Sequence, residues 1–398
     1  MTPKHEFEHD VKLDVEARVR QGVKAVLEEV LEEEMSEHLE AGYRELTPTR
    51  RGERNGHYTR NLVTPAGKIE RLEVPRDREG EFVTEVFEVF ERYKRMTGDV
   101  EEAVLEMYLS GISVRKIAGV TEALSRVKVG KDAVSRIASR LQEEQKEWRG
   151  RSLEEKEYPY LYLDATYLKV RWGARVTSMA LLVCVGVDEE GFREVLAVEV
   201  AGSEKGVAYA SLLRGLIDRS LKGVRLVVSD DHESIKAAVA EELPGVEWQR
   251  CTVHFQRNVL SHVPASSMAE VAEDLKAVFK VRRQKTARAL AEEFVELYGK
   301  SYPKAVSVFE AGIEDALTYL RYPGSHHARI RTTNMLERLF KEVKRRTRVV
   351  GVFPNETSAA TLATEIVLRS SEEWALRRYL TVDALEEAEK PNPQLSRH

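Results

Sequence analysis

The sequence predicts a mixed α/β domain that is interrupted by a block of helices and preceded by a mainly helical N-terminal region. Three observations support this fold class. β-rich runs begin near Tyr158 and then alternate with a helix, which is typical of a mixed sheet. Residues 253–322 carry helical patterns and no strand candidate. Before Tyr158 most patterns have helical spacing, and only one short hairpin is indicated.

Composition describes a water-soluble globular chain. Of the 398 residues, 42% are hydrophobic and 32% are charged, and this length predicts roughly two to four folded units. The longest apolar runs, such as residues 179–187, are far shorter than a membrane span, and the first ten residues contain no apolar signal region. Two cysteines cannot build a disulfide framework. We therefore expect a cytoplasmic protein that makes no membrane contact.

Net charge, taken alone, argues against a nucleic-acid-binding protein. The 62 Lys and Arg residues are outnumbered by 67 Asp and Glu residues, which leaves a formal charge of −5. The charges are unevenly spread, because acids concentrate at residues 26–40 and bases concentrate further along the chain. Binding depends on the local field and not on the sum, so the basic segments decide this question.

The N-terminal region is predicted to hold one long amphipathic helix and a hairpin. Apolar residues recur at helical spacing between about residues 11 and 39, beside a strongly acidic outer face. This helix should pack on its own domain, and self-association through it is the alternative. Residues 62–74 predict a short hairpin across a PAGK turn. The polar stretch before it, residues 47–61, carries Arg54 and Arg60 and is either a phosphate-contacting loop or a solvated one.

Residues 98–150 are predicted to form helices joined by short turns. The last two helices are each opened by a capping residue, Ser113 for one and Asp132 for the other. Their polar positions carry several cations, among them Arg115 and Arg136. This order fits a helix-turn-helix DNA-binding segment, although short helices joined by turns are also common in proteins that bind no DNA.

From Tyr158 onward the sequence predicts a sheet. Three β-rich runs come first, and a DEEG turn at residues 188–191 joins the second to the third. A helix over residues 205–219 and two further strands follow, and the helical block then lies between the fifth strand and the last helices. The five strand candidates are residues 158–172, 176–187, 192–200, 224–230 and 246–251.

The segment Arg331–Asn355 predicts a capped and strongly basic helix. Thr332, Thr333 and Asn334 are good N-cap residues, and Glu337 falls on one stripe with three cations at about 100° per residue. A charged stripe is usually a solvated face, but eight bases against two acids indicate a phosphate-binding surface. The eight bases are Arg329, Arg331, Arg338, Lys341, Lys344, Arg345, Arg346 and Arg348.

Three acids are candidates for catalytic chemistry because of their positions. Asp164 lies inside an apolar strand, where an unpaired carboxylate is costly to bury. Asp230 closes a strand, at the edge where α/β sheets commonly form sites. Glu337 lies on the basic helix. Convergent carboxylates are the ligands that Mg²⁺ prefers, and a pair of such ions suits phosphodiester chemistry.

Each of these acids also has a purely structural interpretation. Asp164 could pair with a cation of its own strand, Lys169 or Arg171. Asp230 could cap the helix that follows it, and Glu337 could form a surface ion pair. From the residues alone, these interpretations are about as well supported as a metal site.

Four motifs, in this order along the chain, resemble those of the Mutator-like family of bacterial insertion-sequence transposases: LDATYLKVR, VVSDDHESIKAAV, WQRCTVHFQRN and RTTNMLERLFKEVKRRTRVVGVFPN. RNGHYTR, VPRDREGEF and SGISVRKIAGV resemble the family's N-terminal half. The resemblance implies a DDE transposase with an RNase H-like catalytic domain. It implies that Asp164, Asp230 and Glu337 are the catalytic acids and hold two Mg²⁺ or Mn²⁺ ions. Asp231 stands where the family more often has a small residue, so either aspartate could be the ligand, and we expect Asp230.

The resemblance also implies partners and an activity. The chain would cleave DNA at the terminal inverted repeats of its own element and join the freed 3′-hydroxyl to target DNA. A homodimer would handle the two ends, and the protein would be associated with the nucleoid. A nuclease that cuts without joining and a non-catalytic DNA-binding protein derived from a transposase are the alternatives. The residues expected to contact DNA are Arg54, Arg60, Arg115, Arg136, Arg331, Asn334, Lys341, Lys344, Arg345 and Arg348.

Cys251 and His254 match the family's CxxH element, and Trp248 precedes them. They amount to half a zinc ligand set, because the sequence holds no second CxxC or HxxxH pair. A structural or DNA-positioning role near the acids is expected instead. Trp248 could stack on a base, although burial is the ordinary role of a tryptophan.

The sequence and the resemblance together predict six segments. The predicted segments are residues 1–97 (N-terminal helix and hairpin, DNA-end contact and dimerisation), 98–150 (helix-turn-helix-like), 155–255 and 326–382 (the two parts of the RNase H-like domain), 256–325 (the helical insertion) and 383–398 (C-terminal tail).

Overall fold

Two compact units make up the chain, Met1–Ser139 and Arg140–His398. The division falls inside helix α5 (Lys131–Gly150), so it does not coincide with the boundary predicted after residue 150. The predicted tail 383–398 lies outside the described residues. The computed structural model describes residues 3–45, 47–64, 66–82, 84, 98–125, 129, 131–202 and 205–380.

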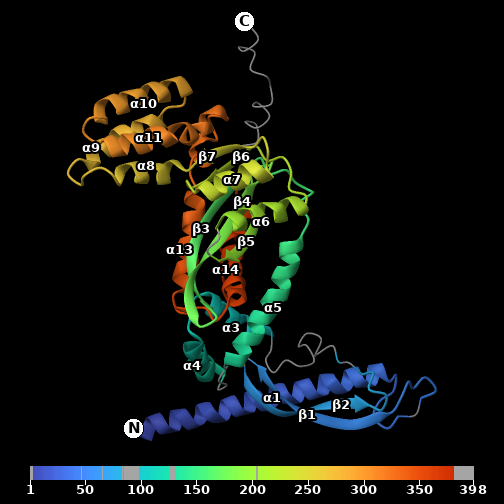
Figure 1. Ribbon diagram of the computed structural model, residues 1–398. Coiled ribbons are helices and arrows are strands. Elements are labelled where there is room, and N and C mark those ends of the chain that lie inside the picture. The colour runs from blue at the N-terminus through green and yellow to red at the C-terminus, as the bar shows by residue number, and fades with distance from the viewer. Residues whose placement is uncertain are drawn as a thin grey trace. The chain divides into compact units, whose positions relative to one another are not determined.

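The first unit is built on a long helix packed against a hairpin (Figure 1). Leu27 and Leu31 of α1 (Pro3–His38) lie against apolar residues of β1 (Arg54–Thr64) and β2 (Gly67–Asp77), so the expected packing of this helix on its own domain is confirmed. The hairpin is longer than predicted. Residues 54–61, expected in a loop, belong to β1, where residues such as Tyr58 favour strand structure and pair across the ladder.

In the described part of the chain, three further helices follow the hairpin: α3 (Gly98–Leu109), α4 (Val114–Ser125) and α5. Ser113 caps α4 as expected, because its Oγ lies 3.4 Å from the Lys116 backbone nitrogen. Asp132 is the second residue of α5 and not the residue before it. Both helices of the predicted helix-turn-helix segment are therefore present, while most of the residues between them lie outside the described part of the chain.

A five-stranded mixed sheet forms the centre of the second unit, which confirms the α/β prediction. The strand order is β5-β4-β3-β6-β7. β3, β4 and β5 are antiparallel neighbours, whereas β3, β6 and β7 run parallel. The strands are β3 (Tyr160–Trp172), β4 (Arg175–Val187), β5 (Arg193–Ala201), β6 (Leu226–Ser229) and β7 (Glu247–Arg250).

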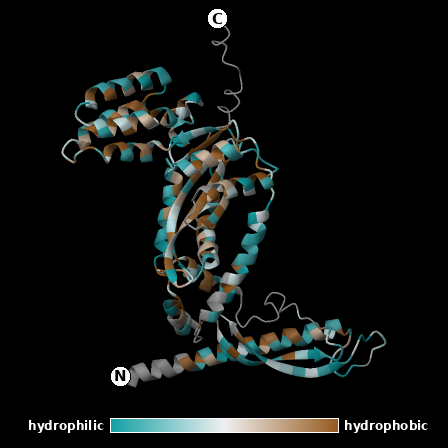
Figure 2. Ribbon diagram, in the orientation of Figure 1, coloured by the Kyte–Doolittle hydropathy of each residue, from teal (hydrophilic) through white to brown (hydrophobic). Residues whose placement is uncertain are grey.

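Helices cover both faces of this sheet. Leu161 and Leu163 of β3 enter the core formed with α6 (Lys205–Asp218) and α7 (Glu233–Glu242). Because alternate residues of a strand point to opposite faces, Tyr162 and its even-numbered neighbours face the other way. The Tyr162 hydroxyl lies 3.4 Å from the Arg329 carbonyl on that face, where α13 (Asn334–Thr347) runs along β3 and α14 (Glu356–Ser371) lies beside it (Figure 1). Figure 2 shows apolar residues concentrated on the central strands.

The predicted helical insertion is confirmed between β7 and α13. Its helices pack through aromatic rings, with the Phe294 and Phe309 centroids 4.6 Å apart. Gln249 of β7 anchors the insertion, because its side chain donates to the Ala316 carbonyl at 2.9 Å and accepts from the Tyr319 backbone N–H at 2.6 Å. The elements are α8 (Thr252–Leu260), α9 (Met268–Lys280), α10 (Gln284–Tyr298), α11 (Pro303–Ala316), η1 (Thr318–Arg321) and α12 (His327–Ile330).

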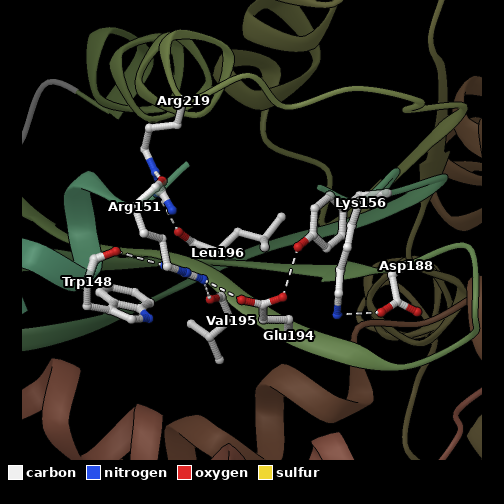
Figure 3. Close-up of polar contacts among 9 residues, drawn as sticks. Trp148, Arg151, Lys156, Asp188, Glu194, Val195, Leu196 and Arg219 are labelled. Carbon is white, nitrogen blue, oxygen red and sulfur yellow. Dashed lines mark hydrogen bonds and ion pairs between the residues drawn. The ribbon is translucent and has the colours of Figure 1, made fainter. Parts of the chain in front are cut away.

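Arginines close the outer edge of β5, as Figure 3 shows. Arg151 donates to the Val195 carbonyl at 2.8 Å and to the Glu194 carboxylate at 2.7 Å. Arg219 donates to the Leu196 carbonyl at 2.8 Å. Unpaired carbonyls on an edge strand invite pairing with another strand, so these side chains protect the sheet from misassembly.

Gly186 gives a test of the core packing. An added Cβ at this β4 position would lie 2.6 Å from Tyr158 Cδ1 and 2.7 Å from Leu196 Cδ1. Gly186→Ala should therefore lower the free energy of unfolding by about 1–3 kcal/mol, measured by urea denaturation. Gly215→Ala on α6 is the control, since nothing lies within 4 Å of its added Cβ, and it should be neutral or stabilise by up to about 1 kcal/mol. Equal effects of the two changes would contradict this packing.

Candidate functional site

Asp164 on β3 lies beside Asp230, the residue that directly follows the parallel neighbour strand β6. The ladder pairs Tyr162 of β3 with Val228 of β6, and the two aspartates are each two residues further along. Asp164 is buried, with 6% of its surface exposed, and its Oδ1 accepts a hydrogen bond from the Ala165 backbone N–H at 2.8 Å. The sheet therefore brings together two of the three acids singled out from the sequence.

The electrostatic environment of Asp164 disfavours its charged form. Burial raises the pKa of Asp164, the charge of Asp230 adds to this effect, and the pKa reaches about 6. The Ala165 N–H, the charge of His254 and the side chain of Thr333 oppose the shift. A carboxylate whose pKa is raised by both burial and a like charge is typical of a functional site.

No cation from its own strand neutralises Asp164. Lys169 and Arg171 lie an odd number of residues away, so they point to the opposite face of β3, and both are exposed. Within the described residues neither forms an ion pair with Asp164. The structural interpretation of Asp164 as half of a same-strand pair is therefore wrong.

Glu337 is joined to this cluster through α8. Its Oε1 lies 3.0 Å from Arg257 Nη1 and 3.3 Å from His254 Nε2. The charge of His254 acts on Asp164 as well, so one imidazole links the glutamate of α13 to the aspartates of the sheet. Arg257 was not singled out from the sequence, although its position three residues after His254 places both on one face of a helix.

The CxxH pair is electrostatically coupled. Hydrogen bonding to Cys251 raises the pKa of His254 to about 9 against the effect of burial, and the charges of Cys251, Asp164 and Asp230 add to the increase. His254 is therefore a cation at neutral pH. Burial alone would raise the pKa of Cys251, but hydrogen bonds with His254 and the Thr333 backbone outweigh it and lower that pKa below its ordinary value.

Cys251 also ties three segments together. Its backbone N–H donates to the Ser229 carbonyl at the end of β6, at 2.7 Å. Its Sγ accepts from the Thr333 backbone N–H at 3.4 Å, immediately before α13. The next residue, Thr252, donates its N–H to the Arg331 carbonyl at 2.9 Å. The CxxH element thus fixes the start of α13 next to the strand end that precedes Asp230.

The structure distinguishes the adjacent aspartates Asp230 and Asp231. Asp231 is engaged in an ion pair with Arg250 Nη2 at 2.6 Å, whereas Asp230 is the aspartate whose charge acts on both Asp164 and His254. The helix after them begins with His232 as its N-cap residue, without a side-chain capping bond. Of the two, Asp230 faces the cluster.

Trp248 has a supporting position. It is buried, and its Nε1 donates to Ser229 Oγ at 2.8 Å. The Lys236 ammonium lies 4.9 Å from the centre of its ring. The indole therefore packs under the end of β6 in the way expected of an ordinary core tryptophan.

The donor chemistry of the cluster suits a hard divalent cation. Asp164 and Asp230 bring like charges together at a buried position, and a cation between them would relieve the repulsion that raises the pKa of Asp164. Glu337, as placed, contacts His254 and Arg257. Among the residues that the structure describes, no three Asp, Glu, His or Cys side chains are grouped in a metal-binding arrangement.

The cations expected to contact DNA are spread over both units. Lys341 and Lys344 of α13 and Arg348, which directly follows the helix, are exposed along the stripe that begins at Glu337. Asn334 is exposed at the start of the helix, and Arg331 donates to the Phe279 carbonyl at 2.6 Å.

Two other groups of expected contacts have different surroundings. Arg345 forms an ion pair with Glu342 at 2.8 Å on the outer side of α13. In the unit Met1–Ser139, Arg54 is largely buried against Glu32 and Ser36 of α1. Arg60 lies half-buried on β1, while Arg115 and Arg136 are exposed on α4 and α5. Their role in DNA contact stays a prediction.

Comparison with known proteins identifies close relatives. The family described as "Transposase, Mutator family" matches residues 4–376. The chain is 42% identical over 355 residues to the transposase for insertion sequence element ISRM5 of Rhizobium meliloti, covering 89% of this chain and 88% of that protein. It is 36% identical over 351 residues to the transposase for insertion sequence element IS256 in transposon Tn4001 of Staphylococcus aureus, covering 87% and 89%.

Likeness to solved structures is much weaker. A Drosophila P element transposase strand transfer complex aligns with 76% of this chain and 87% of that chain, at 11% identity and a TM-score of 0.32. A likeness at that level does not establish a shared fold. Among the described residues, no helix is long and apolar enough to cross a membrane.

The raised pKa of Asp164 predicts a pH-dependent stability. The folded chain binds this proton more tightly than the unfolded chain, so stability is lost as pH rises from about 4 through about 6. Asp164→Asn removes this pH-dependent loss and should raise the melting temperature at pH 8 by roughly 2–6 °C, with about half of that effect at pH 5, which lies between the unfolded and folded pKa values. Calorimetry at both pH values measures this, with the exposed Asp218→Asn as control. A variant that melts lower than the parent at pH 8 would contradict the assignment.

Proposed function

The chain belongs to the Mutator family of transposases, and we propose that it is a DDE-type enzyme that cleaves DNA at the ends of its insertion sequence and joins the freed 3′-hydroxyl to target DNA. Asp164, Asp230 and Glu337 are the proposed catalytic acids. The observation that carries the proposal is the proximity of Asp164 on β3 to Asp230 at the end of β6, together with the contact of His254 with Glu337 at the head of a basic helix.

The sheet supports an RNase H-like assignment for the second unit. Across the sheet, the antiparallel strands β5, β4 and β3 come first, and β6 and β7 then run parallel to β3. Asp164 lies on β3, and Asp230 directly follows β6. The helical insertion enters after β7 and returns the chain at α12 and α13. Glu337 thereby lies beside His254, whose charge also acts on Asp164, although more than a hundred residues separate Asp230 from Glu337 in sequence.

Two Mg²⁺ or Mn²⁺ ions held by Asp164, Asp230 and Glu337 would activate the attacking oxygen and stabilise the leaving one. The protein's own groups prepare the site for such chemistry. Thr333 lies within hydrogen-bonding reach of Asp164, and His254 and Arg257 both contact the Glu337 carboxylate. Lys341, Lys344 and Arg348 follow on the same stripe of α13 and are placed to bind phosphates along one strand.

The partners follow from the reaction. The substrate is the terminal inverted repeats of the element, and the second substrate is target DNA. Two ends must be processed together, so we propose that a homodimer is the active form. In this arrangement each protomer positions one element end beside its own acids.

Paired substitutions on one helix test the catalytic assignment. Glu337→Gln should reduce Mg²⁺-dependent cleavage of an inverted-repeat duplex by at least about a thousandfold, the effect of losing roughly 4 kcal/mol of transition-state stabilisation. Glu342→Gln is the matched control, because this exposed glutamate pairs with Arg345 on the same helix, and it should retain near-parental rates. Duplex binding should survive in both variants.

Two results would contradict the proposal. Undiminished cleavage by Glu337→Gln or by Asp164→Asn would remove these acids from catalysis. A pre-cleaved inverted-repeat end that is never joined to a second duplex, while intact ends are still cut, would identify a nuclease and not a transposase.

A further inference from the structure

The β3–β4 hairpin extends beyond the rest of the sheet and carries a run of exposed cations and aromatic rings. We define this part, Tyr167–Ser178, as the arm. We propose that the arm binds duplex DNA next to the catalytic acids, with Lys169, Arg171 and Arg175 on phosphates and Trp172 at its tip against a base or sugar. The inference rests on the proposed function, because it takes DNA as the substrate.

The arm is a regular two-stranded ribbon. Lys169 pairs with Ser178 and Trp172 pairs with Arg175 across the antiparallel ladder. The turn between them contains Gly173, whose φ of 59° is a left-handed conformation that favours glycine. The ribbon geometry fixes its side chains on two defined faces, in contrast to a flexible basic loop.

Both faces of the arm carry exposed aromatic and cationic groups: Tyr167, Lys169 and Arg171 alternate on one face, and Trp172 pairs with Arg175 on the other. Trp172 has 61% of its surface exposed and Tyr167 has 46%. Lys169, Arg171 and Arg175 are also exposed. Aromatic rings next to cations are typical of nucleic-acid surfaces, where the rings contact bases and the cations contact phosphates.

The cations of the arm differ from two cations in the segment before β3. Lys156 pairs with Asp188 at 3.0 Å, and Arg151 pairs with Glu194 at 2.7 Å. In the described part of the chain, by contrast, no ion pair engages Lys169, Arg171 or Arg175. The arm contains three bases and no acid, although the whole chain has a charge of −5. Its local field is therefore positive and complementary to a phosphate backbone.

The arm is also held against the basic end of α13. Phe353, just after α13, donates its N–H to the Lys169 carbonyl and accepts from the Arg171 N–H, both at 2.8 Å. This segment acts as a short parallel neighbour of the arm through the Val170–Phe353 bridge. These backbone hydrogen bonds hold the segment that follows Lys344 and Arg348 against the arm.

The two basic elements start from the acids and run the same way. Arg171 is seven residues from Asp164 along β3, or about 23 Å. Arg348 is eleven residues from Glu337 along α13, or about 17 Å. These lengths correspond to about five to seven base pairs of duplex at about 3.4 Å each. A duplex with its scissile bond at the acids would therefore reach the arm.

A salt titration tests the arm. The assay uses the full-length chain carrying Asp164→Asn, which should not cleave DNA. Its affinity for a fluorescein-labelled 30-base-pair duplex of mixed sequence is to be measured by fluorescence anisotropy at 50–200 mM NaCl. Replacing Lys169, Arg171 and Arg175 together by Gln should reduce the slope of log affinity against log salt by about 2–3, since each phosphate contact contributes about 0.9. Affinity at 50 mM NaCl should fall by more than tenfold.

A matched triple variant distinguishes the loss of the arm's contacts from the general effect of removing three positive charges. Lys285, Lys300 and Lys304 are exposed on the helical insertion, and replacing them by Gln removes the same charge. This control should keep the parental slope. Equal slopes for the two triple variants, each with a parental circular-dichroism spectrum and melting temperature, would overturn the proposal. A greater loss for a single-stranded 30-mer than for the duplex would overturn the assignment to duplex DNA.

Trp172 gives an independent readout that leaves the charge unchanged. The duplex should quench tryptophan fluorescence of the chain, and Trp172→Phe should remove most of that quenching. Undiminished quenching in this variant would exclude the tip of the arm from the interface.

With the three acids intact, the arm variant should need a more than tenfold higher DNA concentration for half-maximal cleavage, whereas the acid variants should lose the maximal rate itself. If the arm does not bind DNA, the salt titration shows it, and if the acids are not catalytic, the cleavage rates show it, so the two proposals fail in different measurements.

Discussion

Tyr162 pairs with Val228 in the parallel ladder between β3 and β6, and this register sets Asp164 beside Asp230. A shift of one residue would turn one aspartate to the opposite face. The Cys251 junction depends on the same strand end: its N–H binds the Ser229 carbonyl and its Sγ accepts from the Thr333 N–H. The start of α13, and Glu337 with it, is therefore positioned relative to the end of β6. The positions of the two aspartates, Cys251 and Glu337 thus all depend on the pairing of β3 with β6.

Two like charges at a buried position need compensation, and the chain supplies part of it with its own cations. His254 is kept protonated at neutral pH by Cys251 and by the aspartates, and Arg257 shares Glu337 with it. The pKa of Asp164 nevertheless stays near 6, which shows that the protein's own groups do not fully offset burial and repulsion. Burying carboxylates whose charges are incompletely compensated lowers the stability of the fold relative to an apolar core. Such destabilising groups are typical of functional sites.

Charge is segregated along this chain. Acids dominate α1, while the stripe of α13 and the arm carry exposed bases. The net charge of −5 therefore says little about binding, since a phosphate backbone responds to charges within about 8 Å at physiological salt. Backbone hydrogen bonds between Phe353 and the arm place the two basic elements together. Both elements begin near the proposed catalytic acids, so the positively charged surface extends away from these acids in one direction.

Periodicity and turn chemistry in the sequence determined the strands, the helical insertion and the basic helix, because these patterns are local and strongly repeated. The motifs also determined the family. Strand pairing was decided only by the tertiary structure: no local pattern tells that Asp164 meets Asp230, or that Lys169 and Arg171 turn away from Asp164 and stay exposed. Likewise, the sequence placed Arg54 in a loop as a candidate DNA contact, whereas in the structure it pairs with Glu32 because β1 packs on α1. Contacts between residues distant in sequence depend on register and packing, which a single sequence does not display.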